Sequence, residues 1–351
     1  MALFALKNAR FCGVASCVPV HTESNYDLPL LTPKERELLV KSTGIEKRRV
    51  APGGICSSDL CVEGARELLK QLNWAPEEIS ILLFITQTPD YITPASSALI
   101  QDRLSLSHGC IALDINLGCS GYVYGLAITA SLLNALGGGK ALLLAGDIST
   151  ATISQQDKST VPIFSDAGSA TALEYDPQAP EMFFNLEGDG SRFETIIIPA
   201  GGYRKPVDTA ALEYRQRGEG IVRNDTHLIL NGIDVFNFSV REVPRNVNKL
   251  LTFAGTAKND IDYYVFHQAN LIINEAIRKK LQLPADRVPY SLHDFGNTSS
   301  ATIPVTLTTC LREKLQTSNV KMLLSGFGVG LSWGSALIQT RQICCPQLIE
   351  I

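Results

Sequence analysis

The stretch DINLGCSGY at residues 114–122 decides how the rest of the chain is interpreted. The apolar run Ile111–Leu113 before it predicts a buried strand, and the Ala-, Leu- and Gly-rich run Tyr122–Leu136 after it predicts a tightly packed helix. Cys119 therefore lies in a sharp turn between a strand and a helix, flanked by glycines. Backbone N–H groups and the dipole at a helix start favour a thiolate, so Cys119 is a candidate nucleophile. A buried packing thiol is the alternative.

Length, charge and hydropathy predict a cytoplasmic protein with a large core and without nucleic-acid or membrane partners. The 351 residues are 45% hydrophobic, which is enough for two domains or one duplicated one. A net charge of −4 gives no basic footprint for nucleic acid. No run reaches the roughly 18 apolar residues that span a bilayer. Residues 1–7 are apolar but lack a basic lead and a cleavage site, so we expect them to form the first strand.

The nine cysteines predict neither a disulfide framework nor a metal site. Their number is odd, no pair has the CxxC spacing, and no histidine lies at ligand spacing from them. Most are expected to be small apolar fillers in a reducing compartment.

Strand-like and helix-like runs alternate, which predicts an α/β protein with short connections. The predicted strands are Phe11–Val18, Ile79–Thr86, Ile111–Ile115 and Ala141–Gly146, and the predicted helices are Leu60–Leu72, Ala95–Leu104 and Tyr122–Leu136.

The second half of the chain repeats the first. Four short segments recur in the same order, about 166 to 182 residues further on. The pairs are 75–84 with 257–266, 117–120 with 295–298, 142–146 with 322–326, and 168–170 with 334–336. We therefore predict an N-terminal half (1–180) that carries Cys119 and a C-terminal half (181–351), joined at a turn near residues 176–180.

The repeat pairs Cys119 with Asn297, because each follows a glycine before an expected helix. In a pseudo-symmetric fold such positions can face each other near the axis, where α/β sheets bind ligands. Asn297 could equally be a helix N-cap.

Two further segments have the context of a functional site. His267 leaves an apolar strand and enters a polar turn, although a structural histidine is the alternative. His293, near Asn297, is a weaker candidate. The turn GFGVG at 326–330 could present backbone N–H groups or be an ordinary tight connection.

Four motifs together resemble those of β-ketoacyl-ACP synthase III, a thiolase-like condensing enzyme. They are GCSG at 118–121, HQAN at 267–270, GNTS at 296–299 and GFGVGLSWG at 326–334. TGI at 43–45 followed by KRR at 47–49 resembles a further motif of the family. The resemblance implies the five-layered αβαβα thiolase-like fold, built from two pseudo-symmetric halves, and a homodimer.

The resemblance also implies the chemistry. Cys119 would accept the acyl group, and His267 and Asn297 would complete the triad by donating hydrogen bonds to the enolate formed when malonyl thioester loses CO₂. The expected oxyanion donors are the Cys119 N–H and an amide of the turn Gly328–Gly330, beside Phe327. Thioesters of coenzyme A or of acyl carrier protein would be substrates, and no metal or other cofactor is implied.

The sequence departs from the family where the adenine of coenzyme A is usually held. Leu38 and Ser42 occupy the positions of a Trp and an Arg, and Ile272 replaces another Arg. An aliphatic side chain and a serine can neither stack on adenine nor form a cation–π contact. The acyl group is therefore expected on a carrier protein or another thioester, unless residues such as Lys158 hold coenzyme A.

Two other segments bear on partners. Arg278, Lys279 and Lys280 lie where the family has a basic patch for the acidic carrier protein, although a solvated helix face is equally in keeping with three charges. Thr93 replaces an aromatic residue that a partner subunit pushes into the acyl pocket, which predicts acceptance of chains longer than acetyl.

Competing functions are an acyltransferase that acylates a hydroxyl or amine without condensation, and a degenerate, purely structural relative. Asn297 counts against the first, and the intact triad and glycine turn count against the second. A thiolase would carry a second cysteine in the turn at 326–330, which has none. The altered coenzyme A positions favour a specialised lipid, polyketide or surface-sugar pathway over housekeeping fatty-acid initiation.

Overall fold

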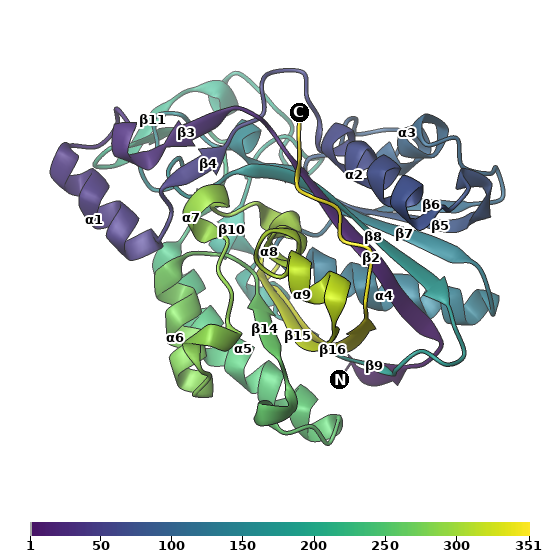
Figure 1. The fold of residues 1–351 in the computed structure, drawn as a ribbon. Coiled ribbons are helices and arrows are strands. Elements are labelled where there is room, and N and C mark those ends of the chain that lie inside the picture. Colours follow the sequence, from purple (N-terminus) through teal and green to yellow (C-terminus); the bar gives the residue numbers. More distant parts are fainter. Residues whose placement is uncertain (1) are drawn as a thin grey trace.

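Two mixed β-sheets lie one behind the other in the computed structural model, which describes residues 2–351 (Figure 1). The first sheet has the order β17 (Ile349–Glu350), β2 (Ala9–Val18), β8 (Asp166–Tyr175), β7 (Lys140–Ile148), β5 (Ile79–Ile85) and β6 (Ile111–Ile115). The second has the order β1 (Ala2–Leu6), β9 (Met182–Gly188), β16 (Ser332–Arg341), β15 (Asn319–Gly328) and β14 (Tyr263–Phe266).

Helices form three layers around these sheets. The helix α2 (Ser57–Leu72) and the helix α3 (Ser96–Arg103) cover the outer face of the first sheet. The helix α4 (Gly121–Leu136) and the helix α8 (Thr302–Cys310) lie between the sheets, with α9 (Arg312–Thr317) after α8. The helix α5 (Gly232–Phe253) and the helix α6 (Leu271–Leu281) cover the second sheet. The order helix, sheet, helix, sheet, helix confirms the predicted αβαβα thiolase-like fold.

Short elements complete the chain at the edges of this core. The helices α1 (Pro33–Thr43) and α7 (Leu292–Phe295) lie next to the two-stranded sheet of β3 (Thr22–Ser24) and β4 (Lys47–Arg49) (Figure 1). Two further ribbons pair β10 (Ile196–Ile197) with β13 (Ile229–Leu230), and β11 (Arg215–Gly218) with β12 (Ile221–Arg223).

The internal repeat is present in the topology. In one half β5 runs parallel to β7, which pairs antiparallel with β8; in the other β14 runs parallel to β15, which pairs antiparallel with β16. The glycines that the repeat aligned occupy equivalent positions in register, since Gly146 faces Gly168 and Gly326 faces Gly334. Each half also has one central helix between the sheets: α4 is followed directly by β7, and α8 is followed by the short helix α9 and then β15. The strands and helices predicted in the first half are confirmed to within a few residues.

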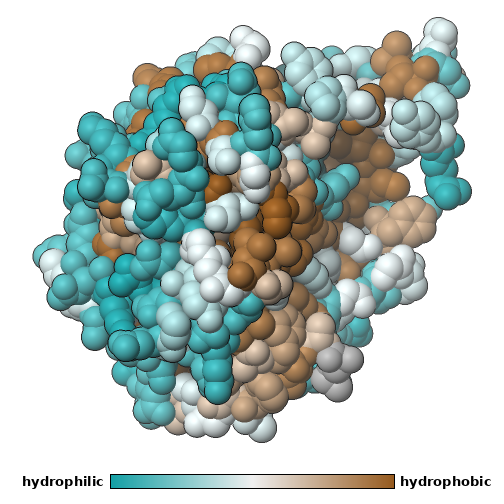
Figure 2. Space-filling view, turned by 90° about the vertical axis from the view of Figure 1, so that its right-hand side faces the viewer, coloured by the Kyte–Doolittle hydropathy of each residue, from teal (hydrophilic) through white to brown (hydrophobic). Residues whose placement is uncertain are grey.

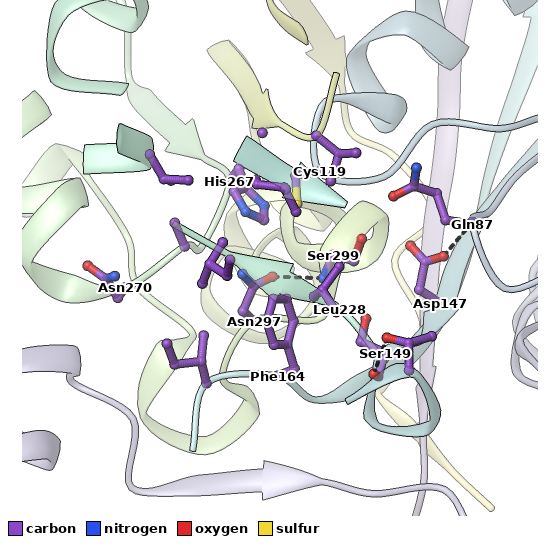
Figure 3. Close-up of a pocket in the computed structure, with 18 of the residues that line it drawn as sticks. Gln87, Cys119, Asp147, Ser149, Phe164, Leu228, His267, Asn270, Asn297 and Ser299 are labelled. Atoms are coloured by element: carbon purple, nitrogen blue, oxygen red, sulfur yellow. Dashed lines mark hydrogen bonds between the residues drawn. The ribbon is translucent and has the colours of Figure 1, made fainter. Parts of the chain in front are cut away.

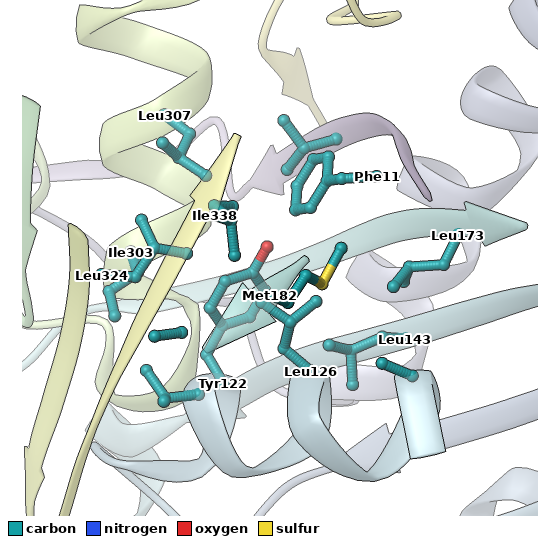
Figure 4. Close-up of a cluster of buried hydrophobic side chains, with 14 of the residues drawn as sticks. Phe11, Tyr122, Leu126, Leu143, Leu173, Met182, Ile303, Leu307, Leu324 and Ile338 are labelled. Carbon is teal, nitrogen blue, oxygen red and sulfur yellow. The ribbon is translucent and has the colours of Figure 1, made fainter. Parts of the chain in front are cut away.

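The largest buried cluster joins the two halves. Figure 4 shows Leu126 of α4 next to Leu143 of the first sheet, Ile303 of α8 next to Leu324 of the second sheet, and Tyr122 of α4 between these two pairs. All five side chains are at most 1% exposed. Burying a large apolar side chain stabilises a fold by about 1.5–3 kcal/mol, so this layer holds the two sheets, and hence the residues at their ends, in one arrangement.

The run Ile111–Leu113 is a strand, as expected, but the prediction that it is buried is wrong. It belongs to β6, the edge strand of the first sheet, and Ile111 is 37% exposed. Hydropathy does not tell an edge strand from a central one, because both can be apolar on both faces. Figure 2 looks at the side where β6 and α3 lie in Figure 1, and hydrophobic side chains gather there.

Each end of the chain adds a strand to the sheet that is built mainly from the other half. The N-terminal strand β1 pairs with β9 of the second sheet, and the C-terminal strand β17 pairs with β2 of the first. The boundary near residue 180 remains a prediction from the sequence. Each of these two terminal strands belongs to one predicted half and pairs with a strand of the other half.

Candidate active site

A cavity of about 200 Å³ lies where the two halves meet (Figure 3). Its lining includes Cys119, His267 and Asn297, so the three residues singled out in the sequence converge on one space. Most of the remaining wall is apolar and includes Ile163, Phe164, Ile196, Ile198, Leu228 and Leu230. A mostly apolar cavity with a few convergent polar groups is the form expected of a binding site for a small molecule.

Cys119 lies in the turn between β6 and α4 and is 8% exposed. The backbone of Gly328 approaches it so closely that a Cβ there would lie 2.7 Å from the Cys119 Cβ and 3.0 Å from its sulfur. Only glycine allows this approach, which brings the turn after β15 against the nucleophile turn across the axis of the repeat.

The Cys119 thiol is protonated in the free enzyme. Burial raises its pKa to about 12, although hydrogen bonds from Ser299 and from the backbone N–H groups of Val329 and Cys119 itself lower it in part. The expectation that the helix start favours a thiolate is therefore wrong for the free enzyme, because desolvation outweighs the amides. The two N–H groups at the sulfur are also the donors that an oxyanion formed there would need.

A chain of hydroxyls supports the glycine turn that contributes Val329. The Ser120 and Ser332 hydroxyls are 2.6 Å apart, and the Ser332 hydroxyl donates to the Val329 carbonyl at 2.6 Å. This chain joins the residue after Cys119 to the turn that faces it.

His267 follows β14 and continues its ladder, because its N–H donates to the Ser325 carbonyl of β15 at 2.8 Å. The ring packs edge-on against Phe327 with a centroid separation of 5.4 Å, and its Nδ1 lies 2.7 Å from the Thr302 hydroxyl. Burial lowers the pKa of His267 to about 3, so the imidazole is neutral. A neutral ring in a dry cavity can donate or accept a hydrogen bond but cannot supply a full charge.

Asn297 is held by its backbone and by one end of its amide. Its N–H donates to the Ile163 carbonyl and its carbonyl accepts from the Ser165 N–H, both at 3.0 Å. The Ser299 N–H donates to Asn297 Oδ1 at 2.9 Å, which assigns the amide orientation and leaves Nδ2 as the free end. The cap-like bond predicted as an alternative thus uses only the oxygen, and the amide remains a donor.

Asp147 and Ser299 belong to the site but were missed in the sequence. The buried Asp147 carboxylate accepts from Ser300, through N–H and hydroxyl at 3.2 and 2.7 Å, and from the Gln87 N–H at 2.7 Å. It therefore ties the segment after Asn297 to the end of β5. Asp147 follows the apolar run Ala141–Ala145 and Gly146 near the end of β7, and a polar residue after an apolar strand is also the signal that identified His267. Ser299 has a positive φ of 52°, which local sequence does not reveal.

Several residues that the sequence predicted for the site do not line the cavity of the single chain. Thr93 is exposed on the loop before α3 and does not line the cavity. His293 is exposed and contacts Glu46 at 3.0 Å. On α6, Lys279 and Lys280 are exposed, whereas Arg278 is held by two hydrogen bonds of 2.7 Å to Glu275.

The positions that depart from the family's adenine clamp lie together near α1. Leu38 is 58% exposed, and the Ser42 hydroxyl donates a hydrogen bond to the Leu39 carbonyl at 2.9 Å. Lys158 Nζ lies 3.5 Å from a carboxylate oxygen of Glu35 on the same helix.

Residues 2–351 contain no group of three or more His, Cys, Asp or Glu side chains placed to bind a metal ion. Within the same range, no helix has the length and apolar content needed to cross a membrane.

Comparisons with known proteins agree with one another. The family 3-oxoacyl-[acyl-carrier-protein] synthase III matches residues 113–190, and its C-terminal counterpart matches residues 251–340. A β-ketoacyl-[acyl-carrier-protein] synthase III of Alkalilimnicola ehrlichii is 33% identical, covering 94% of this chain and 99% of the relative. The crystal structure of a 3-oxoacyl-(acyl-carrier protein) synthase from Burkholderia xenovorans superposes with a TM-score of 0.94 at 37% identity, covering 99% of both chains. The enzyme from Pseudomonas aeruginosa gives 0.83 at 30% identity, covering 96% and 99%.

Proposed function

Because the chain belongs to the 3-oxoacyl-[acyl-carrier-protein] synthase III family, we propose that Cys119, His267 and Asn297 are its catalytic triad. The family is an acyltransferase family whose reaction condenses an acyl thioester with malonyl-ACP to a 3-oxoacyl thioester. The observation that carries the assignment is that the three side chains, from both halves of the repeat, line one cavity.

In the first half-reaction Cys119 takes the acyl group. Its sulfur attacks the thioester carbonyl, and the tetrahedral oxyanion accepts hydrogen bonds from the N–H groups of Cys119 and Val329. The C–S bond to the donor then breaks, and the thiol proton of Cys119 leaves with the departing thiol. Because the cysteine pKa is high, this proton must move during the attack rather than before it.

In the second half-reaction malonyl-ACP loses CO₂ and becomes an enolate. Neutral His267 and the free Nδ2 of Asn297 donate hydrogen bonds to the enolate oxygen. The enolate carbon attacks the acyl-Cys119 carbonyl, the bond to sulfur breaks, and the Cys119 thiolate regains a proton from water. An amide at residue 297 suits this step, because a carboxylate would repel the enolate.

A homodimer completes the proposed acyl pocket. The edge strand β6 leads into the turn of Cys119, and hydrophobic side chains gather on this side of the molecule (Figures 1 and 2). In the loop between β5 and α3, Tyr91 and Ile92 are 60% and 81% exposed. Pairing of β6 with its copy would cover these groups and remove the open sheet edge. The loop with Thr93 could then line the partner's cavity. The nine free thiols fit the proposed cytoplasmic location.

The donor experiment tests the function as a whole. Purified protein is incubated with acetyl, butyryl and octanoyl thioesters of coenzyme A and of acyl carrier protein, and its intact mass is measured before and after addition of malonyl-ACP. We expect an acyl adduct on Cys119, better loading from carrier-protein donors than from coenzyme A because the adenine contacts are missing, and loading by chains longer than acetyl. The product should be two carbons longer than the donor. An enzyme that loads acetyl-CoA alone would contradict the donor proposals, and absence of any adduct would contradict the triad.

Carrier docking is proposed for the exposed end of α6. The helix starts at the cavity, where Asn270 and Ile273 line the wall, and ends with Lys279 and Lys280. Arg278 is included in the proposed patch, although its pair with Glu275 leaves it less free to contact an acidic partner.

We expect Lys279→Glu with Lys280→Glu to raise the KM for malonyl-ACP about tenfold, because two attractions become repulsions, while kcat stays unchanged. Steady-state kinetics with malonyl-ACP measures both constants. The matched control is Lys70→Glu with Lys314→Glu, which makes the same change of charge on exposed helix positions of α2 and α9. An unchanged KM in the α6 variant, or an equal rise in the control, would reject this docking surface.

A further inference from the structure

Acyl transfer to Cys119 needs a group that accepts the proton of its thiol. The pKa of this thiol is raised to about 12, so a thiolate is scarce at neutral pH. Among the described residues that line the cavity, Asp147 and His267 are the other two with titratable side chains. Burial lowers the pKa of His267 to about 3, which makes its ring a weak base. Asp147 is therefore the better acceptor that the cavity offers.

The Asp147 carboxylate is buried near the end of β7, with only 1% of the residue exposed. Its hydrogen-bond donors are all neutral, and they are the N–H groups of Gln87 and Ser300 and the hydroxyls of Thr86, Thr88 and Ser300. Burial raises the pKa of Asp147, and hydrogen bonds lower it only in part. The titratable groups that its charge affects are the thiols of Cys119 and, from α2, of Cys61. The carboxylate is thus a stronger base than an exposed aspartate.

The Ser299 hydroxyl connects this carboxylate with the nucleophile. It hydrogen-bonds to the Cys119 sulfur and to the Asp147 carboxylate, and it lies between these two side chains in Figure 3. A Cβ at Gly118 would lie 3.2 Å from the same hydroxyl oxygen, so Ser299 is packed against the turn that carries Cys119. A hydroxyl can accept one hydrogen bond while it donates another. Ser299 can therefore pass a proton from the sulfur to the carboxylate.

We propose that Asp147 takes up the thiol proton of Cys119 through the Ser299 hydroxyl while the acyl group is transferred. This inference rests on the proposed function, in which Cys119 attacks a thioester. As the new C–S bond forms, the S–H proton moves to Ser299 Oγ and the Ser299 hydroxyl proton moves to the carboxylate. When the bond from the acyl carbon to the donor sulfur breaks, Asp147 returns its proton to Ser299 Oγ, and Ser299 gives one to the departing thiolate. Asp147 is a carboxylate again at the end, and no proton is gained or lost overall.

The pH dependence of acylation in Ser299→Ala tests this proton path. Intact mass follows the acylation of Cys119 in a single turnover between about pH 7 and pH 9. In the wild type the rate should reach a plateau once Asp147 is ionised, because the path needs no free thiolate. In Ser299→Ala the rate at pH 7 should fall about 100-fold or more, which is the usual contribution of a general base. The remaining rate should rise about tenfold per pH unit without a plateau, since only thiolate formed beforehand can attack.

Decarboxylation of malonyl-ACP, measured by CO₂ release, shows whether the site of Ser299→Ala is intact. It should stay within about threefold of wild type, because the Asn297 amide is held by the N–H of residue 299 and not by its hydroxyl. Ser299→Gly removes the same hydroxyl from a backbone with a φ of 52°, which glycine adopts freely. This second variant should show the same loss of the plateau even if the alanine folds poorly.

Ser300→Ala is the matched control, because it removes another hydroxyl that donates to the same carboxylate. The N–H of residue 300 still donates to Asp147, and the Ser299 hydroxyl remains. Its acylation rate should therefore keep the plateau. Asp147→Asn cannot accept the proton and should lose the plateau as Ser299→Ala does. The double variant Ser299→Ala with Asp147→Asn should lose no more than either single variant, because the two residues act as one unit.

Each outcome separates the proton path from the proposed function. A plateau that persists in Ser299→Ala and Ser299→Gly, its loss in Ser300→Ala, or additive losses in the double variant would overturn the inference, while the acyl adduct itself would still support the nucleophile. A wild-type rate that rises about tenfold per pH unit throughout the range would also overturn it. If no thioester acylates the wild type at any pH, the proposed function has failed, and the inference fails with it.

Discussion

Cys119→Ala should form no acyl-enzyme and should lower the condensation rate by at least about 10⁴-fold, as loss of a nucleophile does in other covalent enzymes. The structure offers no second thiol for the role, because Cys119 is the only cysteine that lines the cavity formed by the described residues. The alanine should fold normally, since it removes a single sulfur atom next to Gly328 and leaves the backbone N–H groups in place. Intact mass with an acyl donor, followed by a coupled condensation assay, measures both effects.

Cys119→Ala should nevertheless release CO₂ from malonyl-ACP, because His267 and Asn297 still donate to the enolate oxygen. The matched control is Cys310→Ala, which removes an exposed thiol on α8. This control should load acyl groups at the wild-type rate. An acyl adduct on the Cys119→Ala protein, or loss of loading in Cys310→Ala, would contradict the assignment of the nucleophile.

Asn297→Asp should lower the rate of decarboxylation on the order of 10³-fold while leaving acylation of Cys119 nearly unchanged. The substitution removes one donor to the enolate oxygen and adds a negative charge beside it. The local fold should persist, because a carboxylate oxygen can accept the Ser299 N–H as the amide oxygen does, and the backbone bonds to Ile163 and Ser165 remain. CO₂ release from malonyl-ACP and single-turnover acylation give the two rates.

Asn297→Ala separates the two causes. Alanine removes the donor without adding a charge, so its loss should be smaller than that of aspartate by about tenfold, or about 1.4 kcal/mol. Equal losses in the two variants would contradict the charge argument. A full rate in Asn297→Asp would remove Asn297 from the proposed triad.

The sequence by itself determined the class of fold and the residues that meet in the cavity. Each predicted element in the first half is in the structure, and Cys119 and Asn297, which the internal repeat paired, line the same cavity. These features depend on local patterns, namely apolar periodicity, glycines at turns and polar residues at strand ends, and short motifs in a consistent order extended them to His267. A local pattern can be read without knowing what packs against it.

Only the tertiary structure decided the electrostatics and the surroundings of these residues. The high pKa of Cys119 arises from burial beneath the turn of Gly328, which lies far along the chain. The roles of Asp147 and Ser299 depend on bonds between the halves of the repeat. The Nδ1 of His267 contacts the hydroxyl of Thr302, which belongs to another element. The exposure of β6 follows from its place at the edge of a sheet, not from its own residues. Burial and hydrogen-bond partners are set by contacts that are distant in sequence, so a pattern along the chain names the reacting groups while their protonation follows from the fold.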